Sequence, residues 1–226
     1  MSLPGTRSPQ PRKTPRQARS VFTVNAVFDA TIQVLLSDGL QRLTTTRVAD
    51  RAGVSVGALY QYYPNKRSLL HAVLKRHLDH VAESVEQACQ RHHRQPLAVM
   101  VERLVCSFVD AKTARQEESR ALYLVSADLD SADLVGKASK RIYSAISSML
   151  ATASDAHFDE LPMAAFMILS AMVGPTRSVL EGGAPPKMLL REQLVTLCDA
   201  YLNRIAIPEA GSDVRPAGDA SISDHE

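Results

Sequence analysis

The sequence has little of what builds disulfide-braced or β-rich proteins. Its three cysteines, Cys89, Cys106 and Cys198, lie far apart and form no Cys-x-x-Cys pair. This spacing excludes a disulfide framework and a cysteine-based zinc site, and we expect buried thiols in a reducing compartment. Alternating β-branched runs between turn residues are almost absent, so strand signals are weak. We therefore predict an all-α fold.

Long apolar runs are also missing. Residues 1–20 contain no apolar stretch, so we expect no signal peptide. No run reaches the about 18 uninterrupted apolar residues of a membrane span, and the richest, 161–173, contains Pro162 and Ser170. With 226 residues, 45% of them hydrophobic, the chain can bury a core in one or two domains. We expect a soluble, cytoplasmic protein.

Acidic residues are scarce at one end of the chain. Residues 1–67 hold ten Lys or Arg against three acids, a net charge of +7 in a chain of net charge +2. Residues 208–226 hold five acids and one Arg, a net charge of −4, which leaves −1 for the middle. This segregation favours a polyanionic partner for the N-terminal part alone.

Residues 44–66 contain two short helical patterns joined by a glycine turn. A hydroxyl run, Thr44 to Thr46, can cap the first helix, and Gly53 can end it because glycine adopts the left-handed conformation without a Cβ clash. Ser55 is a candidate N-cap for the second helix, which Pro64 stops. This spacing predicts a helix-turn-helix, whose second helix enters the major groove of DNA.

The segment from about Ala18 to Leu74 resembles the N-terminal domain of the TetR family of bacterial transcriptional regulators, over about a quarter of the chain. The motifs that carry the resemblance are Asp38-Gly39, the Thr-Thr-Arg start of the second helix, Ala49, Ala52-Gly53-Val54-Ser55, Leu59-Tyr60, Tyr63-Pro64, Asn65-Lys66 and Leu69-Leu70. In that family the remaining helices form a variable ligand-binding and dimerising domain, so the resemblance implies the same here.

The resemblance assigns DNA contacts to three groups of residues. Thr45, Thr46 and Arg47 fall at phosphates or base edges. The reading face of the recognition helix comprises Ser55, Val56, Gly57, Ala58, Gln61 and Tyr62. Tyr60 and Lys66 match positions that grip the DNA backbone, and their donors suit phosphate, while Gln61 suits an adenine edge. For Tyr60, partial burial against the first helix is the alternative.

We predict about nine helices in four segments. Residues 1–19 form a disordered basic arm, which either lies along a minor groove or has no role, and residues 207–226 form a disordered acidic tail. Residues 20–66 form the DNA-binding domain, and residues 67–206 form the ligand-binding and dimerisation domain. Six helices are expected after the helix-turn-helix, at 65–91, 96–111, 117–127, 134–153, 161–180 and 187–205.

The last two helices are the predicted dimer interface. The first of them is apolar on most sides, which requires burial in the core, against a second subunit, or both. The family resemblance favours a four-helix bundle between two copies, and two-fold symmetry would present two heads to a palindromic operator. The residues predicted at this interface are Ala164, Ala165, Ile168, Met172, Leu194, Leu197 and Tyr201.

A pocket for a small lipophilic ligand is the family-level expectation for the body. Methionine and aromatic side chains suit an adaptable cavity, although an apolar helical face is more often plain core. The predicted lining residues are Met100, Phe108, Arg120, Tyr123, Tyr143, Met149, His157, Met163, Phe166 and Met167.

Catalytic and metal patterns are weak. Residues 53–57 formally match G-x-S-x-G, but a charged helical segment precedes them where a nucleophile elbow needs a strand. His77 and His80 lack a supporting HExxH motif or cysteine cluster, which favours an ordinary exposed helix face. We therefore expect no enzyme, no cofactor and no metal site. The predicted function is a ligand-responsive repressor of transcription; the alternative is a small all-α binding or enzymatic protein whose basic head binds nucleic acid nonspecifically.

Overall fold

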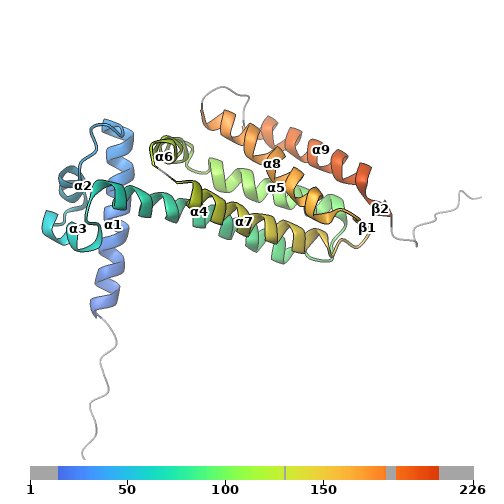
Figure 1. Cartoon of the computed structure of the whole chain (residues 1–226), viewed down its shortest axis with the longest axis horizontal. Helices are drawn as coiled ribbons and strands as arrows, with labels where there is room; N and C mark the ends of the chain where they lie inside the picture. The colour runs from blue at the N-terminus through green and yellow to red at the C-terminus, as the bar shows by residue number, and fades with distance from the viewer. Residues whose placement is uncertain (1–14, 130, 182–186, 209–226) are drawn as a thin grey trace, which may run out of the picture. The chain divides into compact units, whose positions relative to one another are not determined.

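The computed structural model describes residues 15–129, 131–181 and 187–208 (Figure 1). These residues form nine α-helices and one pair of two-residue strands, which confirms the predicted all-α fold. The elements are α1 (Pro15–Asp38), α2 (Thr45–Ala52), α3 (Val56–Tyr62), α4 (Lys66–Arg91), α5 (Leu97–Thr113), α6 (Gln116–Asp128), α7 (Ala132–Leu150), β1 (Ala156–His157), α8 (Leu161–Leu180), α9 (Lys187–Ile205) and β2 (Ile207–Pro208).

The chain divides into two compact units. The first comprises residues up to 78 together with residues 115–134, and the second comprises residues 79–114 and 135 onward. Helix α4 therefore belongs to both units, and α6 belongs to the first. This differs from the predicted domain boundary after residue 66. The first turns of α4 bury a leucine-rich stripe in the core of the first unit, which moves the boundary along the helix. The predicted acidic tail, apart from residues 207–208, and residues 1–14 of the predicted arm lie outside the described residues.

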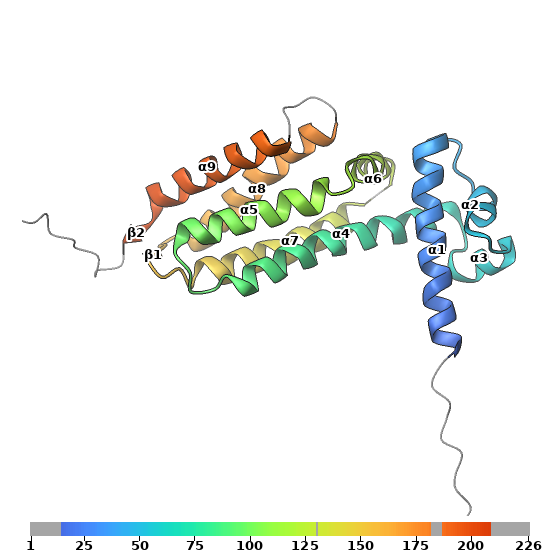
Figure 2. The ribbon, with the colours of Figure 1, turned by 180° about the vertical axis from the view of Figure 1, so that it is seen from behind.

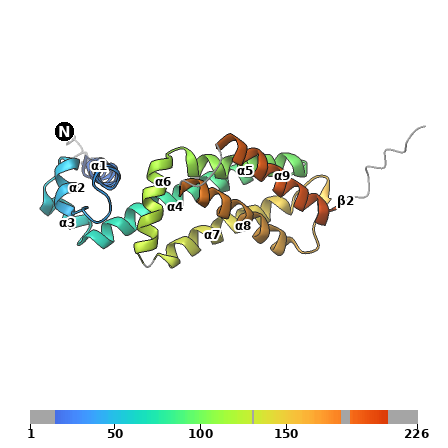
Figure 3. The same cartoon turned by 90° about the horizontal axis from the view of Figure 1, so that it is seen from above.

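Helices α1, α2 and α3 pack together in the first unit (Figure 3). The predicted caps are present: the Thr44 side chain accepts a hydrogen bond from the Arg47 N–H, and Gly53 ends α2 in the left-handed region at φ 67°. The Ser55 hydroxyl oxygen accepts a bond from the Ala58 N–H at 3.1 Å and caps α3. The unit's core includes Val27, Val34, Leu43, Val48, Ala49, Leu59, Leu69, Leu70, Val73, Leu74, Leu122 and Val125.

The second unit is a helical bundle in which α5 contacts both α8 and α9, and α8 contacts α9 (Figure 2). Its core includes Val81, Val85, Met100, Leu104, Phe108, Ile146, Met149, Ala164, Ala165, Ile168, Met172, Leu194, Cys198 and Leu202. Burial raises the pKa of the Cys89 thiol to about 12 and that of the Cys198 thiol to about 11, so both act as apolar residues. Cys106 is only partly buried.

Strands β1 and β2 were not predicted. They pair antiparallel, Ala156 with Pro208 and His157 with Ile207, so the backbone just after α9 is joined to the segment between α7 and α8. Two residues are too few for a period-two pattern, which explains the missed signal.

Two helical segments, Val21–Asp38 and Leu161–Leu180, are long and apolar enough to cross a membrane by length and composition alone. Of these windows 33% and 44% is buried inside the fold. Core helices of water-soluble proteins pass the same test, so the two segments are weak grounds for a membrane protein.

Candidate nucleic-acid interface

Helix α3 is anchored by one side and exposed on the other. Leu59 is its fully buried residue, with 0% exposure in the core of the first unit. Ser55, Gly57, Gln61 and the other residues around it that point away from Leu59 are exposed or only partly buried. The face predicted to read DNA is therefore on the surface of this unit, comprising Ser55, Val56, Gly57, Ala58, Tyr60, Gln61 and Tyr62.

A hydrogen bond joins α3 to the start of α2. Tyr60 Oη lies 3.0 Å from Thr45 Oγ1, and the Tyr60 ring is 46% exposed while Thr45 is 8% exposed. Tyr60 is thus not buried against the first helix, as the alternative expectation required. Thr45 was expected to contact DNA, but its burial and this bond give it the geometry of a support for the Tyr60 hydroxyl. Thr46, next in the chain, is exposed.

Lys66 is also tied to the protein. Its ammonium donates a hydrogen bond to the Leu40 carbonyl oxygen at 2.7 Å and is partly buried. This bond joins the start of α4 to the loop between α1 and α2. Because a lysine ammonium carries three donors, two remain for a phosphate.

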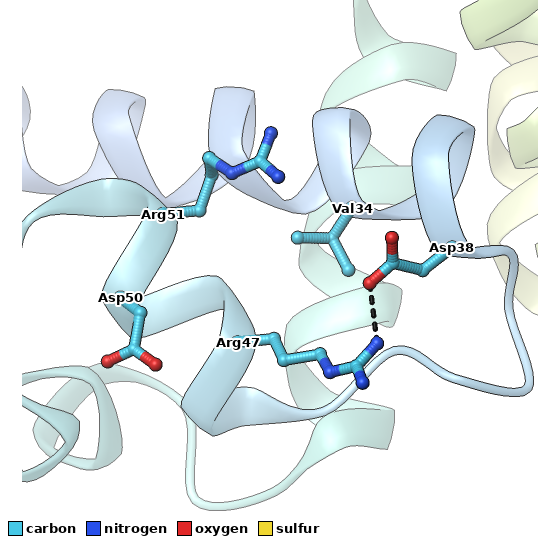
Figure 4. Close-up of a pocket in the computed structure, with 5 residues that line it drawn as sticks. All are labelled: Val34, Asp38, Arg47, Asp50 and Arg51. Atoms are coloured by element: carbon cyan, nitrogen blue, oxygen red, sulfur yellow. Dashed lines mark hydrogen bonds and ion pairs between the residues drawn. The ribbon is translucent and has the colours of Figure 1, made fainter.

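Arg47 lies beside an open hollow between α1 and α2, shown in Figure 4. The Arg47 Nη1 donates to Asp38 Oδ2 at 2.6 Å, in an ion pair whose side chains are 52% and 28% exposed. A hydrogen bond from Ser37 and the charge of Arg47 lower the pKa of Asp38, so the carboxylate is ionised at neutral pH. Arg47 is therefore held in place by α1 while half of its side chain remains open to solvent. The hollow is lined by Val34, Asp38, Arg47, Asp50 and Arg51.

Aromatic contacts fix the end of α3. The rings of Phe28 and Tyr63 lie 5.8 Å apart between centroids, and the Arg76 guanidinium lies 5.2 Å from the Phe28 centroid. Arg76 also donates to Asn25 Oδ1 at 3.1 Å. Such cation–π contacts contribute about 0.5–1 kcal/mol at exposed sites. Sequence reasoning missed this role for Arg76, because the contact joins residues that no local spacing relates.

The G-x-S-x-G match has no nucleophile geometry. Gly53 caps α2, and the Ser55 hydroxyl accepts the Ala58 N–H between two helices, whereas a nucleophile elbow follows a strand. Among the described residues, no group of three or more His, Cys, Asp or Glu side chains is placed to hold a metal ion.

The residues predicted to line a ligand pocket do not come together in one place. In the second unit, Met100, Phe108 and Met149 are fully buried core residues, and Tyr143 is partly buried against them. His157 is exposed in β1. Arg120, which is exposed, and Tyr123, which is partly buried, belong to α6 in the first unit. The remaining three, Met163, Phe166 and Met167, are 55%, 56% and 42% exposed on α8.

The predicted dimer residues lie mostly in the core instead. The side chains of Ala164, Ala165, Ile168, Met172 and Leu194 are at most 2% exposed, so they are not available to a second copy. Leu197 is exposed and Tyr201 partly so. The prediction assigned the wrong arc of α8 to the surface, because the helix is apolar almost all round. Its exposed apolar face consists of Met163, Phe166, Met167 and Val173.

Comparisons with known proteins agree with this geometry. The family model for "Bacterial regulatory proteins, tetR family" matches residues 27–73, which include the helix-turn-helix. The model for "Tetracyclin repressor-like, C-terminal domain" matches residues 96–202. Together the two models cover more than half of the chain.

Similarity to curated relatives is limited to the N-terminal part of the chain. Nucleoid occlusion factor SlmA from Actinobacillus pleuropneumoniae is 47% identical over 51 residues, which is 22% of this chain and 25% of that protein. The transcriptional activator FasR from Mycolicibacterium smegmatis is 39% identical over 75 residues, 32% of this chain and 34% of that protein. The matched part thus spans only a quarter to a third of the length of these relatives.

Similarity in fold extends much further. The solved structure of a TetR-family transcriptional regulator from Mesorhizobium loti is 18% identical, with a TM-score of 0.67 over 86% of this chain and 100% of that one. At this identity the likeness shows a shared fold. The helix-turn-helix with its exposed α3, the two family models and this common architecture lead to one conclusion: the chain belongs to the TetR family of DNA-binding transcriptional regulators.

Proposed function

We propose that this regulator is a homodimeric repressor that binds a palindromic operator in the cytoplasm and is released by a small lipophilic ligand. The observation that carries the proposal is the exposed face of α3, held by Leu59 inside and by the Tyr60–Thr45 hydrogen bond beside it. A rigid, exposed, polar helix face is what major-groove reading requires. Release by ligand is proposed on family grounds.

The DNA contacts divide by chemistry. Gln61, exposed on α3, is proposed to read a base edge, because its amide can pair with adenine bidentately. Arg47, Tyr60 and Lys66 are proposed to hold phosphates, since each is already positioned by a bond within the protein and keeps a donor or an exposed side chain. Phosphate contacts set affinity and its salt dependence, whereas base contacts set sequence preference.

A second copy is proposed to cover the exposed apolar face of α8. Residues at 163, 166, 167 and 173 follow helical spacing along one face, and Leu189 and Leu197 add exposed apolar surface on α9 at 43% and 51%. A patch of this kind marks an interface in a soluble protein. Two copies related by a two-fold axis would present two α3 helices to the two halves of a palindrome.

The direction of control is proposed as repression, because a bound dimer can block polymerase without any further contact. One relative, FasR, is named an activator, and similarity in the DNA-binding part does not decide between the two outcomes. Reporter expression from a promoter that contains the operator, measured with and without the protein, distinguishes them. Repression requires lower expression when the protein is present.

The experiment that tests the function is selection of sheared genomic DNA by the purified protein at a stated moderate salt concentration. Wild type should retain a few palindromic fragments. Gln61→Ala should lose the preference among fragments while it keeps part of the nonspecific affinity. Gln90→Ala, the same change at an exposed position of α4 in the second unit, is the control and should behave as wild type. Uniform retention by wild type would instead favour a nonspecific basic surface.

A further inference from the structure

Lys112 occupies a position on α5 that otherwise carries core residues. It follows Phe108 by four residues, Val105 by seven and Val101 by eleven, and these three side chains are at most 1% exposed. Residues at these spacings share one face of a helix. The Cα–Cβ bond of Lys112 therefore points toward the core of the second unit, where an apolar side chain would be expected.

The charge of Lys112 is not balanced within the described residues. Two other partly buried cations of this unit have carboxylate partners. Arg141 donates to both oxygens of Glu86 at 2.9 and 2.7 Å and to Asp79 at 3.0 Å, and Arg191 pairs with Asp110. Lys112 forms no such bond with a described residue, and burial is the single cause that lowers the pKa of its amine. Buried ammonium groups normally have a partner.

The nearest acidic residue along α5 does not solve this. Asp110 precedes Lys112 by two residues, which places it on another face of the helix, and it is occupied by Arg191. An anion that balances Lys112 must therefore come from outside the described chain. A single ammonium balances a single negative charge, and apolar neighbours such as Phe108 favour an apolar molecule around that charge.

We propose that Lys112 binds the carboxylate of a small amphipathic organic acid, whose apolar part packs against the α5 face that carries Val105 and Phe108. This rests on the proposed ligand response and gives the ligand a chemical class. Because Val105 and Phe108 are fully packed, the acid binds a more open state of the second unit. Preference for a different state is what ligand-driven release from DNA requires.

The test measures binding of straight-chain carboxylates to the full-length protein without DNA, by calorimetry and by the shift in Tm. The probes are butyrate, octanoate and myristate, each compared with the alcohol of the same chain length. We expect at least one carboxylate to bind and raise Tm, and its alcohol to bind much more weakly. Lys112→Met should weaken the carboxylate about tenfold or more, as loss of a charge-assisted bond does, and should leave the alcohol unchanged.

Two controls keep the result interpretable. Lys140→Met removes an exposed lysine of α7 and should bind the carboxylate as wild type does. Lys112→Met should fold without loss of Tm, because it replaces an unbalanced charge with an apolar side chain of similar length. The proposal is overturned if no carboxylate binds wild type, or if Lys112→Met binds it equally well. Operator affinity, measured separately, shows whether the DNA-binding proposal fails independently.

Discussion

At the residue scale, the candidate interface depends on side chains that are bonded within the protein. Tyr60 is joined to Thr45, fifteen positions earlier, and Lys66 to the Leu40 carbonyl, twenty-six positions earlier. The sequence identified these residues because their spacing is that of a helix-turn-helix. It did not separate supports from contacts, since a bond between distant residues leaves no periodic signal. Thr45 is the clearest case, because only the structure shows that it is buried.

The Tyr60–Thr45 bond can be tested by a double-mutant cycle. Tyr60→Phe and Thr45→Val should each weaken operator binding about fivefold, the effect of about 1 kcal/mol for one hydrogen bond. If Thr45 acts through Tyr60, the double variant should be no weaker than either single one. Fluorescence anisotropy with labelled operator measures the three affinities, and circular dichroism checks the fold. Additive losses would show that Thr45 contacts DNA independently.

Asp38 predicts a pH dependence of stability. Its pKa is lowered from the ordinary 3.8, so its ionised form stabilises the folded state above that value, and the contribution is lost as pH falls through the lowered pKa. Asp38→Asn should therefore unfold at lower urea than wild type at neutral pH. The difference should shrink below about pH 4, where the wild-type carboxyl also gains a proton. A difference that persists unchanged in acid would contradict this role.

At the element scale, the sequence predicted most helix positions but not which faces are buried. The six helices after the helix-turn-helix begin and end within a few residues of their expected bounds. Capping residues and apolar spacing specify such limits locally. In α8, however, apolar residues occur all round, and the period of 3.6 residues does not show which arc faces the core. Phe166 is therefore exposed and its neighbour Ala165 buried, opposite to our expectation.

Two glycines of the helix-turn-helix should respond in opposite directions to the same substitution. Gly53 has φ 67° and no atom within 4 Å of an added Cβ, so Gly53→Ala is disfavoured by backbone conformation alone, at a cost of about 1–2 kcal/mol. Gly57 is helical with equally open space, so Gly57→Ala should stabilise the fold by about 0.5–1 kcal/mol. Urea unfolding measures both, and equal signs would refute the conformational argument.

At the scale of the whole molecule, the sequence predicted a basic head and a separate helical body. Charge segregation and the glycine-joined helices indicate this division, because both are local properties of the chain. The position of the boundary required the fold, because α6 joins the first unit from a later part of the chain. Sequence order does not reveal such a rearrangement, and neither does the single helix α4 that contributes to both units.

The proposed dimer can be tested through one exposed side chain. Phe166 is 56% exposed on α8, so Phe166→Glu should leave the protomer folded while it places a charge inside the proposed interface. Sedimentation should then give the monomer mass, and operator affinity should fall steeply. Leu124→Glu makes the same kind of change at a residue 61% exposed on α6 and should stay dimeric. A dimeric Phe166→Glu variant would place the interface elsewhere.

The hydroxyl-radical footprint of the protein on a retained operator tests the central claim most directly. We expect two equivalent protected segments related by two-fold symmetry, with centres about one helical turn apart or somewhat more. Such a footprint would show two α3 helices reading the two halves of a palindrome. A single protected segment, or protection spread evenly along the DNA, would contradict the account of a dimeric, sequence-specific regulator.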